Sequence, residues 1–170
     1  LKNANNKILK HAYENQLSVN KIHKCCISVR KSQTVNELFL AIFDEFPVFL
    51  KIKSVKLVLI KTIKFDEITK NIKKVSQENL LNFSKFVGLT NSRLVILRDN
   101  LEYKQRVELG LNSSEDNIES EAVLSIKIKN KVIGFIFLES SNKETFSIDQ
   151  ATDYLEFLSK IISMQIEWFL

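Results

Sequence analysis

The chain has 170 residues, of which 45% are hydrophobic and 26% charged, a composition that suits one folded domain and argues against intrinsic disorder. The net charge of +5 comes largely from scattered lysines, without an arginine run or a basic stretch interleaved with aromatics, so nucleic-acid binding is not expected. No apolar run approaches the ~18 residues of a membrane span, and the polar first residues do not resemble a secretory signal, so we expect a cytoplasmic protein that does not enter membranes.

Residues 5–31 are predicted to form a long helix. Apolar residues and one asparagine recur at alternating steps of four and three, the pattern of a coiled-coil seam: Ile8, Ala12, Asn15, Val19, Ile22, Cys26 and Val29. An asparagine at a buried seam position costs stability but fixes register and oligomeric state. The other faces of the helix are polar, so we expect the seam to pair with the rest of the domain or with a second subunit.

A second helix is predicted to begin at Thr34, because Thr34 and Glu37 form a capping box of the T-x-x-E kind. Pro47 lacks the amide hydrogen that a helix interior needs, so the helix is expected to end near Phe46.

The middle of the chain gives weaker signals. Residues 54–63 are predicted to form a strand, and 66–88 one or two short helices. A short apolar strand is predicted at 93–97, then a short helix at 101–109 and a polar loop through 112–117.

The clearest strand pattern begins at Ala122, where apolar and polar residues alternate up to Lys129. Asn130-Lys131 is predicted to form a tight turn. Residues 132–138 are apolar on both faces, which indicates a central strand of the sheet. Gly134 within that strand predicts close packing or a bulge.

The last helix is predicted to open at Ser147, with Gln150 completing a second capping box. One apolar stripe of this helix follows heptad spacing: Ala151, Leu155, Leu158, Ile162 and Phe169. Further apolar residues widen the stripe: Tyr154, Phe157, Ile161, Ile166 and Trp168. A helix this apolar must bury two sides. We expect one side to lie on the sheet and the other on the first helix, its own or a partner's.

These elements predict an α/β (α+β) fold, with one antiparallel sheet, the long N- and C-terminal helices packed on one face and short helices on the other. That order resembles a GAF domain, and specific segments resemble a GAF-like bacterial family known as domain of unknown function, family 484. The segment 119–124 looks like that family's S-x-A-L signature, and F-S-I-D-Q-A-T-D-Y-L at 146–155 is similar to its F-x-x-G-M-G-T-x-x-L motif. Asn15 matches the asparagine of its first helix, and 167–170 its tryptophan-containing tail.

The match departs from the family at the second motif. Asp149 and Ala151 replace its two glycines and Gln150 its methionine, which puts in doubt a backbone-mediated contact there. Asn142-Lys143 and Phe146 form only a fragment of the pattern of cyclic-nucleotide GAF domains, so binding of a cyclic nucleotide is not expected. The heptad seam predicts an N-terminal dimerisation helix at 1–32, and the resemblance implies a GAF-like domain at 33–170.

The resemblance also implies a ligand pocket between the sheet and the helices that cover its other face. Its residues would be Leu57, Leu59, Arg93, Val95, Leu97, Leu101, Ser120, Leu124 and Ile126, with Arg93 and Ser120 as the polar contacts. A filled core without a cavity accounts for the same residues equally well.

The sequence offers little for catalysis or metal binding. The two histidines, His11 and His23, lie about 18 Å apart along one helix. The adjacent Cys25 and Cys26 are expected to stay reduced and structural. Carboxylates near strand ends could pair across a cleft, but the sequence does not place them: Asp99, Glu102, Glu119 and Glu121. We therefore expect no enzyme activity, no cofactor and no metal.

The sequence thus predicts a non-enzymatic sensory or regulatory domain that binds a small molecule and forms a homodimer. Its interface would combine the seam of the first helix with Leu158, Ile162 and Phe169 of the last. The alternative is a protein-interaction module for signalling or scaffolding, with a filled core and no ligand.

Overall fold

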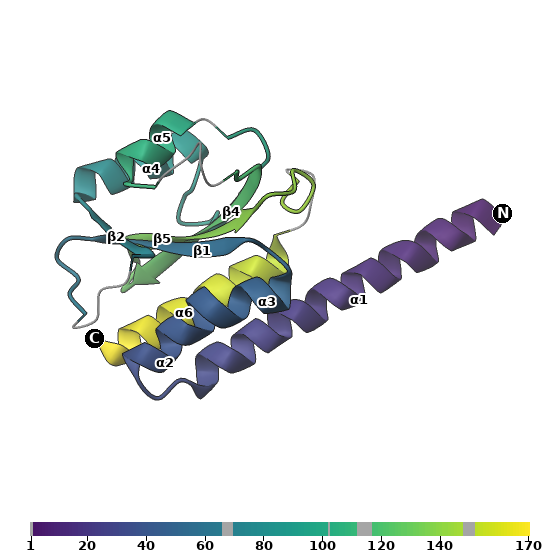
Figure 1. The fold of residues 1–170 in the computed structure, drawn as a ribbon, viewed down its shortest axis with the longest axis horizontal. Helices are drawn as coiled ribbons and strands as arrows, with labels where there is room; N and C mark the ends of the chain where they lie inside the picture. Colours follow the sequence, from purple (N-terminus) through teal and green to yellow (C-terminus); the bar gives the residue numbers. More distant parts are fainter. Residues whose placement is uncertain (1, 66–69, 102, 112–116, 148–151) are drawn as a thin grey trace.

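The computed structural model describes residues 2–65, 70–101, 103–111, 117–147 and 152–170 (Figure 1). The helices and strands follow in the order α1 (Lys2–Lys31), α2 (Val35–Leu40), η1 (Ala41–Glu45), α3 (Phe46–Leu50), β1 (Ser54–Ile60), β2 (Ile72–Val75), α4 (Gln77–Val87), β3 (Val95–Arg98), α5 (Tyr103–Glu108), β4 (Ser120–Ile128), β5 (Lys131–Ser140) and α6 (Asp153–Phe169).

The strands form one mixed sheet in the order β2-β1-β5-β4-β3. The prediction of an antiparallel sheet holds for β1, β5, β4 and β3, but β1 and β2 pair in parallel. β2 was not predicted at all, because its Ile72 and Val75 flank two lysines in a strand of only four residues. β5 lies between β1 and β4, which confirms it as a central strand.

The β4–β5 hairpin turns at Lys129 and Asn130, one residue earlier than predicted. Both have positive φ, 51° and 62°, as a type I′ turn requires, and Ile128 pairs with Lys131 across it. The register then shifts between Ile126 and Lys127, beside Gly134. A Cβ at Gly134 would lie 2.2 Å from the Val58 carbonyl oxygen, so both the close packing and the bulge are confirmed.

Helices cover both faces of the sheet. α1, α2, α3 and α6 lie on one face, and α4 and α5 on the other (Figure 1). α6 is held to β4 by side-chain hydrogen bonds: Ser159 Oγ donates to the Ser125 carbonyl (2.5 Å), and Ser163 Oγ accepts from the Lys127 amide (3.1 Å). The prediction that the terminal helices share one face is confirmed.

α1 and α6 run parallel and pack along each other (Figure 1). Cys25 and Val29 of α1 and Leu158 and Ile162 of α6 have no exposed surface. At the C-terminal ends, Gln165 Nε2 donates to the Ser32 carbonyl (2.9 Å). The domain thus includes the second half of α1.

The second helix does not end near Phe46 as predicted. Thr34 caps it, accepting from the Glu37 amide (3.2 Å), but the chain continues through the π-turn η1 into α3 and ends at Lys51, which is left-handed (φ 54°). The Phe46 amide bonds back to the Ala41 carbonyl, five residues earlier. This wider turn directly before Pro47 gives the ring room that an α-helix interior would deny it.

Two other boundaries differ from the predictions. In the region 66–88 the structure places β2 and one helix, α4, which Ser76 caps through the Asn79 amide (3.1 Å). α6 begins at Asp153 rather than at Ser147, and the predicted partner Gln150 lies outside the described residues.

Gly134→Ala should destabilise the domain by at least about 1–3 kcal/mol, because the added methyl group meets backbone and β1 must shift. The free energy of unfolding in urea measures the loss. Lys131→Ala, at an exposed position of the same strand, is the control and should change stability by less than about 0.5 kcal/mol. Equal stabilities of the two variants would contradict the close approach of β1 and β5.

Candidate functional site

The sheet face beneath α4 and α5 is packed with aromatic side chains. The Phe83 ring of α4 lies 5.3 Å from that of Phe135 and 5.5 Å from that of Phe137 on β5. Side chains alternate along a strand, and directly paired residues on neighbouring strands point the same way. Phe135 and Phe137 therefore show which side chains of each strand lie beneath α4.

Two carboxylates are buried on this same face. Glu121 of β4 and Glu139 of β5 are direct cross-strand partners, and at most 1% of either residue is exposed. Arg106 of α5, itself completely buried, donates to both, through Nη1 to Glu121 and Nη2 to Glu139. Paired like charges repel, so the guanidinium between them is what makes their burial tolerable.

Other polar groups complete this ionic cluster. Arg98 Nη1 donates to Glu121 Oε1 (2.7 Å), and Ser54 Oγ donates to Glu139 Oε1 (2.9 Å), where Lys56 Nζ also lies at 3.7 Å. Arg106 stands 5.9 Å from the Phe137 ring centroid. The cluster thus ties α5 to four strands, β1, β3, β4 and β5.

Burial and charge oppose each other within the cluster. Burial raises the pKa of Glu121, while Arg106 and Arg98 pull it down. Burial lowers the pKa of Arg106, but the Glu121 and Glu139 carboxylates outweigh it, so the Arg106 pKa is raised. The guanidinium stays charged, and its bonds occupy the carboxylates that a general acid or base would need free.

The structure does not place the predicted pocket residues under α4 and α5. Leu124 and Ile126 alternate with Ser125, which pairs with Phe135, so they face α6 on the opposite side. The register puts the other strand residues of the set on that side too: Leu57, Leu59, Val95, Leu97 and Ser120. These strand residues are buried, whereas Arg93 is exposed and Leu101 half-buried.

Ser120 has a structural partner in place of a ligand. Its hydroxyl donates to the Asn142 carbonyl (2.6 Å) and accepts from the Phe146 amide (3.3 Å), which pins the segment after β5 to β4. Of the predicted carboxylates that the structure describes, only Glu121 joins the cluster. Glu119 is exposed, Asp99 half-buried, and Glu102 lies outside the described residues.

The structure divides the predicted dimer residues into two groups. Ile22, Cys26, Val29, Leu158 and Ile162 are buried within the subunit, and Val19 and Phe169 are half-buried. Ile8 and Ala12 are exposed on the first half of α1, which extends beyond the body of the domain (Figure 1). The side chain of Asn15 lies outside the described part.

An apolar stripe lies on the outer side of α6. Phe157 and Met164 are each 56% exposed, Trp168 is 81% exposed, and Tyr154 is 43% exposed. The half-buried Ile161 completes steps of three and four residues along one side of the helix. We call these residues, Tyr154, Phe157, Ile161, Met164 and Trp168, the α6 stripe.

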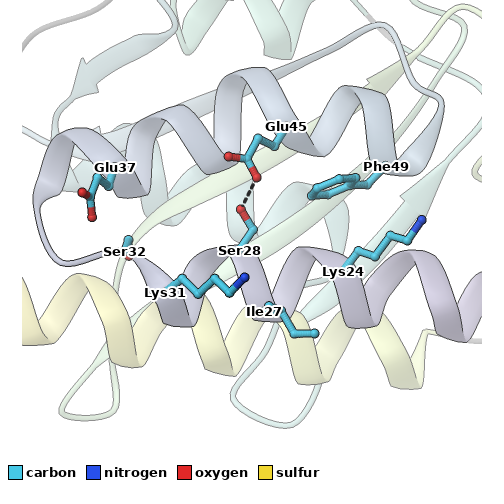
Figure 2. Close-up of a pocket in the computed structure, with 8 residues that line it drawn as sticks. All are labelled: Lys24, Ile27, Ser28, Lys31, Ser32, Glu37, Glu45 and Phe49. Carbon is cyan, nitrogen blue, oxygen red and sulfur yellow. Dashed lines mark hydrogen bonds between the residues drawn. The ribbon is translucent and has the colours of Figure 1, made fainter.

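A groove of about 470 Å³ runs between α1 and the helices α2, η1 and α3 (Figure 2). Its lining is Lys24, Ile27, Ser28, Lys31, Ser32, Glu37, Glu45 and Phe49. Ser28 Oγ donates to Glu45 Oε2 (2.5 Å) across it and joins the two helices. Lysines and glutamates balance along its walls, so its charge favours no ligand of either sign.

A smaller hollow of about 160 Å³ lies where α1 leaves the domain. Its lining is Ser18, Lys21, Ile22, Leu50, Leu97, Thr145, Phe146, Tyr154 and Leu155. Among the predicted pocket residues, Leu97 is the one that borders it.

The thiols and histidines offer no assembled chemistry in the described residues. Burial, with Cys26 beside it, raises the pKa of the Cys25 thiol to about 12, so it stays protonated. His23 is exposed. Within the described ranges no three His, Cys, Asp or Glu residues gather as a metal site would need, and no helix there is long and apolar enough to span a membrane.

Arg106→Met should lower the free energy of unfolding by about 3–5 kcal/mol, because it leaves two carboxylates buried side by side. Adding Glu121→Gln and Glu139→Gln should recover part of that loss. Urea unfolding followed by circular dichroism measures both, with Lys104→Met at an exposed position of α5 as the control. An Arg106→Met variant as stable as its control would show that the cluster does not hold α5.

No protein-family model matches the sequence, and no curated protein matches it. Solved structures do. A bacteriophytochrome from the photosynthetic bacterium R. palustris matches with a TM-score of 0.58 at 8% identity, over 88% of this chain and 37% of that one. The chromophore-binding domain of an unusual bacteriophytochrome from R. palustris gives 0.58 at 9% identity, over 88% of this chain and 61% of that one.

A third match, with a TM-score of 0.49, is the native GAF domain of the potassium sensor histidine kinase of Escherichia coli, at 9% identity and over 88% of this chain and 92% of that one. At such identities a likeness concerns the fold alone. The chain has a GAF-like α/β fold, a mixed five-stranded sheet with the terminal helices packed on it.

Proposed function

We propose that this chain is a non-catalytic regulatory domain that forms a homodimer through α1 and α6. The observation that carries the proposal is the α6 stripe, which lies exposed beside a parallel α1 whose first half extends beyond the domain. A contiguous apolar side on a surface helix is typical of an interaction site.

A second copy of this chain suits the stripe. Large side chains spaced three and four residues apart form the kind of narrow seam that packs against an identical helix about a two-fold axis. The aromatic and methionine residues of the stripe, Tyr154, Phe157, Met164 and Trp168, belong to the types that are enriched at protein interfaces.

The projecting half of α1 supports the same partner. Residues 2–17 extend it by about 24 Å past the start of its packing on α6, and Ile8 and Leu9 there are 66% and 67% exposed. In a dimer built on the α6 stripes, two such segments would lie side by side as a coiled coil.

The absence of catalysis is part of the proposal. The buried carboxylates Glu121 and Glu139 are held by Arg106 and Arg98, and His23 is exposed on α1. The predicted pocket residues on the strands are buried on the face that α6 covers, which favours a domain that acts through its helices. Membership of family 484 and a cytoplasmic location remain predictions.

Phe157→Asp combined with Trp168→Asp should convert the dimer to a monomer, because each adds a charge to the apolar contact. Light scattering during gel filtration at tens of micromolar measures the mass. The wild type should have twice the mass of one chain. Phe86→Asp, at a 53% exposed aromatic on α4 across the sheet, is the matched control and should stay dimeric.

The seam residues Ile22 and Leu158 do not suit this test. They are buried within the subunit, so charged substitutions there should unfold the domain whether or not it dimerises. A monomeric wild type at these concentrations, or a dimeric Phe157→Asp/Trp168→Asp variant, would refute the proposed interface.

A further inference from the structure

The small hollow at the exit of α1 has the features of a binding site. Elements from both ends of the chain and from the sheet meet there: Ile22 of α1, Leu97 of β3, Phe146 after β5 and Leu155 of α6. Ile22, Leu97 and Phe146 are 7–8% exposed, so they make a fixed apolar wall. A concave apolar wall with few polar groups is the usual form of a small-molecule site.

The polar groups at the hollow fix the sign of the charge it would accept. Among the described residues that line it, Lys21, which is half-buried, is the charged one. Thr145 Oγ1 accepts from Ser140 Oγ (2.8 Å), which leaves the hydrogen of the Thr145 hydroxyl to donate. A cation and a donor together favour an anionic acceptor.

The volume of the hollow sets the size of the ligand it can hold. A cavity of roughly 150 Å³ accommodates benzene, and this hollow measures about 160 Å³. We propose that it binds a small cyclic monocarboxylate, with one six-membered ring against Ile22, Leu97 and Phe146 and the carboxylate at Lys21 and Thr145. Phe146 and Tyr154 supply aromatic contacts that suit an aromatic ring.

The position of the hollow gives such a ligand a regulatory consequence. Ser18 is exposed while Ile22 is buried, so the hollow adjoins the turn at which α1 leaves the domain. Tyr154 both lines it and begins the α6 stripe. A bound ring would therefore contact the projecting helix and the dimer surface together. This coupling rests on the proposed function, whereas the binding itself does not.

Titration of the full chain with benzoate, followed by amide and methyl NMR shifts, tests the site. Benzoate should saturate with a dissociation constant in the low millimolar range or below and shift Thr145 and Leu155. Benzylamine and benzyl alcohol have the same ring without the carboxylate, and each should bind about tenfold more weakly or worse. Benzylamine as tight as benzoate, or no saturation by benzoate, would overturn the proposal.

Substitutions at two positions test separately the positive charge of Lys21 and the empty volume of the hollow. Lys21→Met should weaken benzoate binding about tenfold, and Lys24→Met, an exposed lysine one turn further along α1, should leave it unchanged. Leu155→Trp should fill the hollow and abolish binding while the thermal unfolding midpoint of the domain is kept. Unchanged affinity in Lys21→Met would refute the carboxylate assignment.

The monomeric Phe157→Asp/Trp168→Asp variant distinguishes this inference from the proposed function. Benzoate should still saturate that monomer and should change the wild-type dimer dissociation constant at least about threefold. By linkage over two sites, its dissociation constants for the monomer and for the wild-type dimer should then differ at least about 1.7-fold. Binding without any change in dimerisation would refute the coupling and leave the site standing. Loss of binding in both proteins would refute the site even if the dimer is real.

Discussion

The packing of the second half of α1 along α6 is the contact on which the rest of the structure depends. It removes Cys25 and Val29 from solvent, and the bond from Gln165 to Ser32 fixes its register. On its other side α6 is tied to β4 through Ser159 and Ser163. α6 thus joins α1 to the sheet. The outer side of α6, which carries the α6 stripe, is exposed to solvent.

The two faces of the sheet are stabilised by different means. The face under α6 is apolar, and its helices are held by burial and a few hydroxyl bonds. The face under α4 and α5 combines Phe83, Phe135 and Phe137 with an ionic cluster at Glu121 and Glu139. Buried ion pairs contribute less to net stability than apolar groups of the same size, but they allow few alternative arrangements. The cluster therefore fixes the position of α5 more than it adds to stability.

The sequence predicted the elements with strong periodicity and missed those that depend on tertiary context. The long helix α1 and the β4–β5 hairpin follow from local patterns, and both elements are confirmed. Helices cover both faces of the sheet, so the alternation along β4 could not tell which of its side chains lie under α4, and the predicted pocket residues lie on the other side. The signal was in Glu121 and Glu139, charged residues inside buried strands, but their partner Arg106 is known only from the fold. Likewise, the π-turn that accommodates Pro47 leaves no pattern in the sequence.

One heptad pattern on α1 serves two purposes, which explains why sequence alone could not separate fold from assembly. Ile22, Cys26 and Val29 continue the steps of Ile8 and Ala12, yet the first group is buried against the same subunit and the second is exposed. In the proposed dimer the seam would change partner midway, and the two halves of α1 would move together because they share one helical backbone. The boundary falls between Ser18 and Ile22, beside the hollow that Lys21 and Tyr154 line. A change of packing at this boundary is therefore the most direct way for the domain to alter the angle of the projecting half.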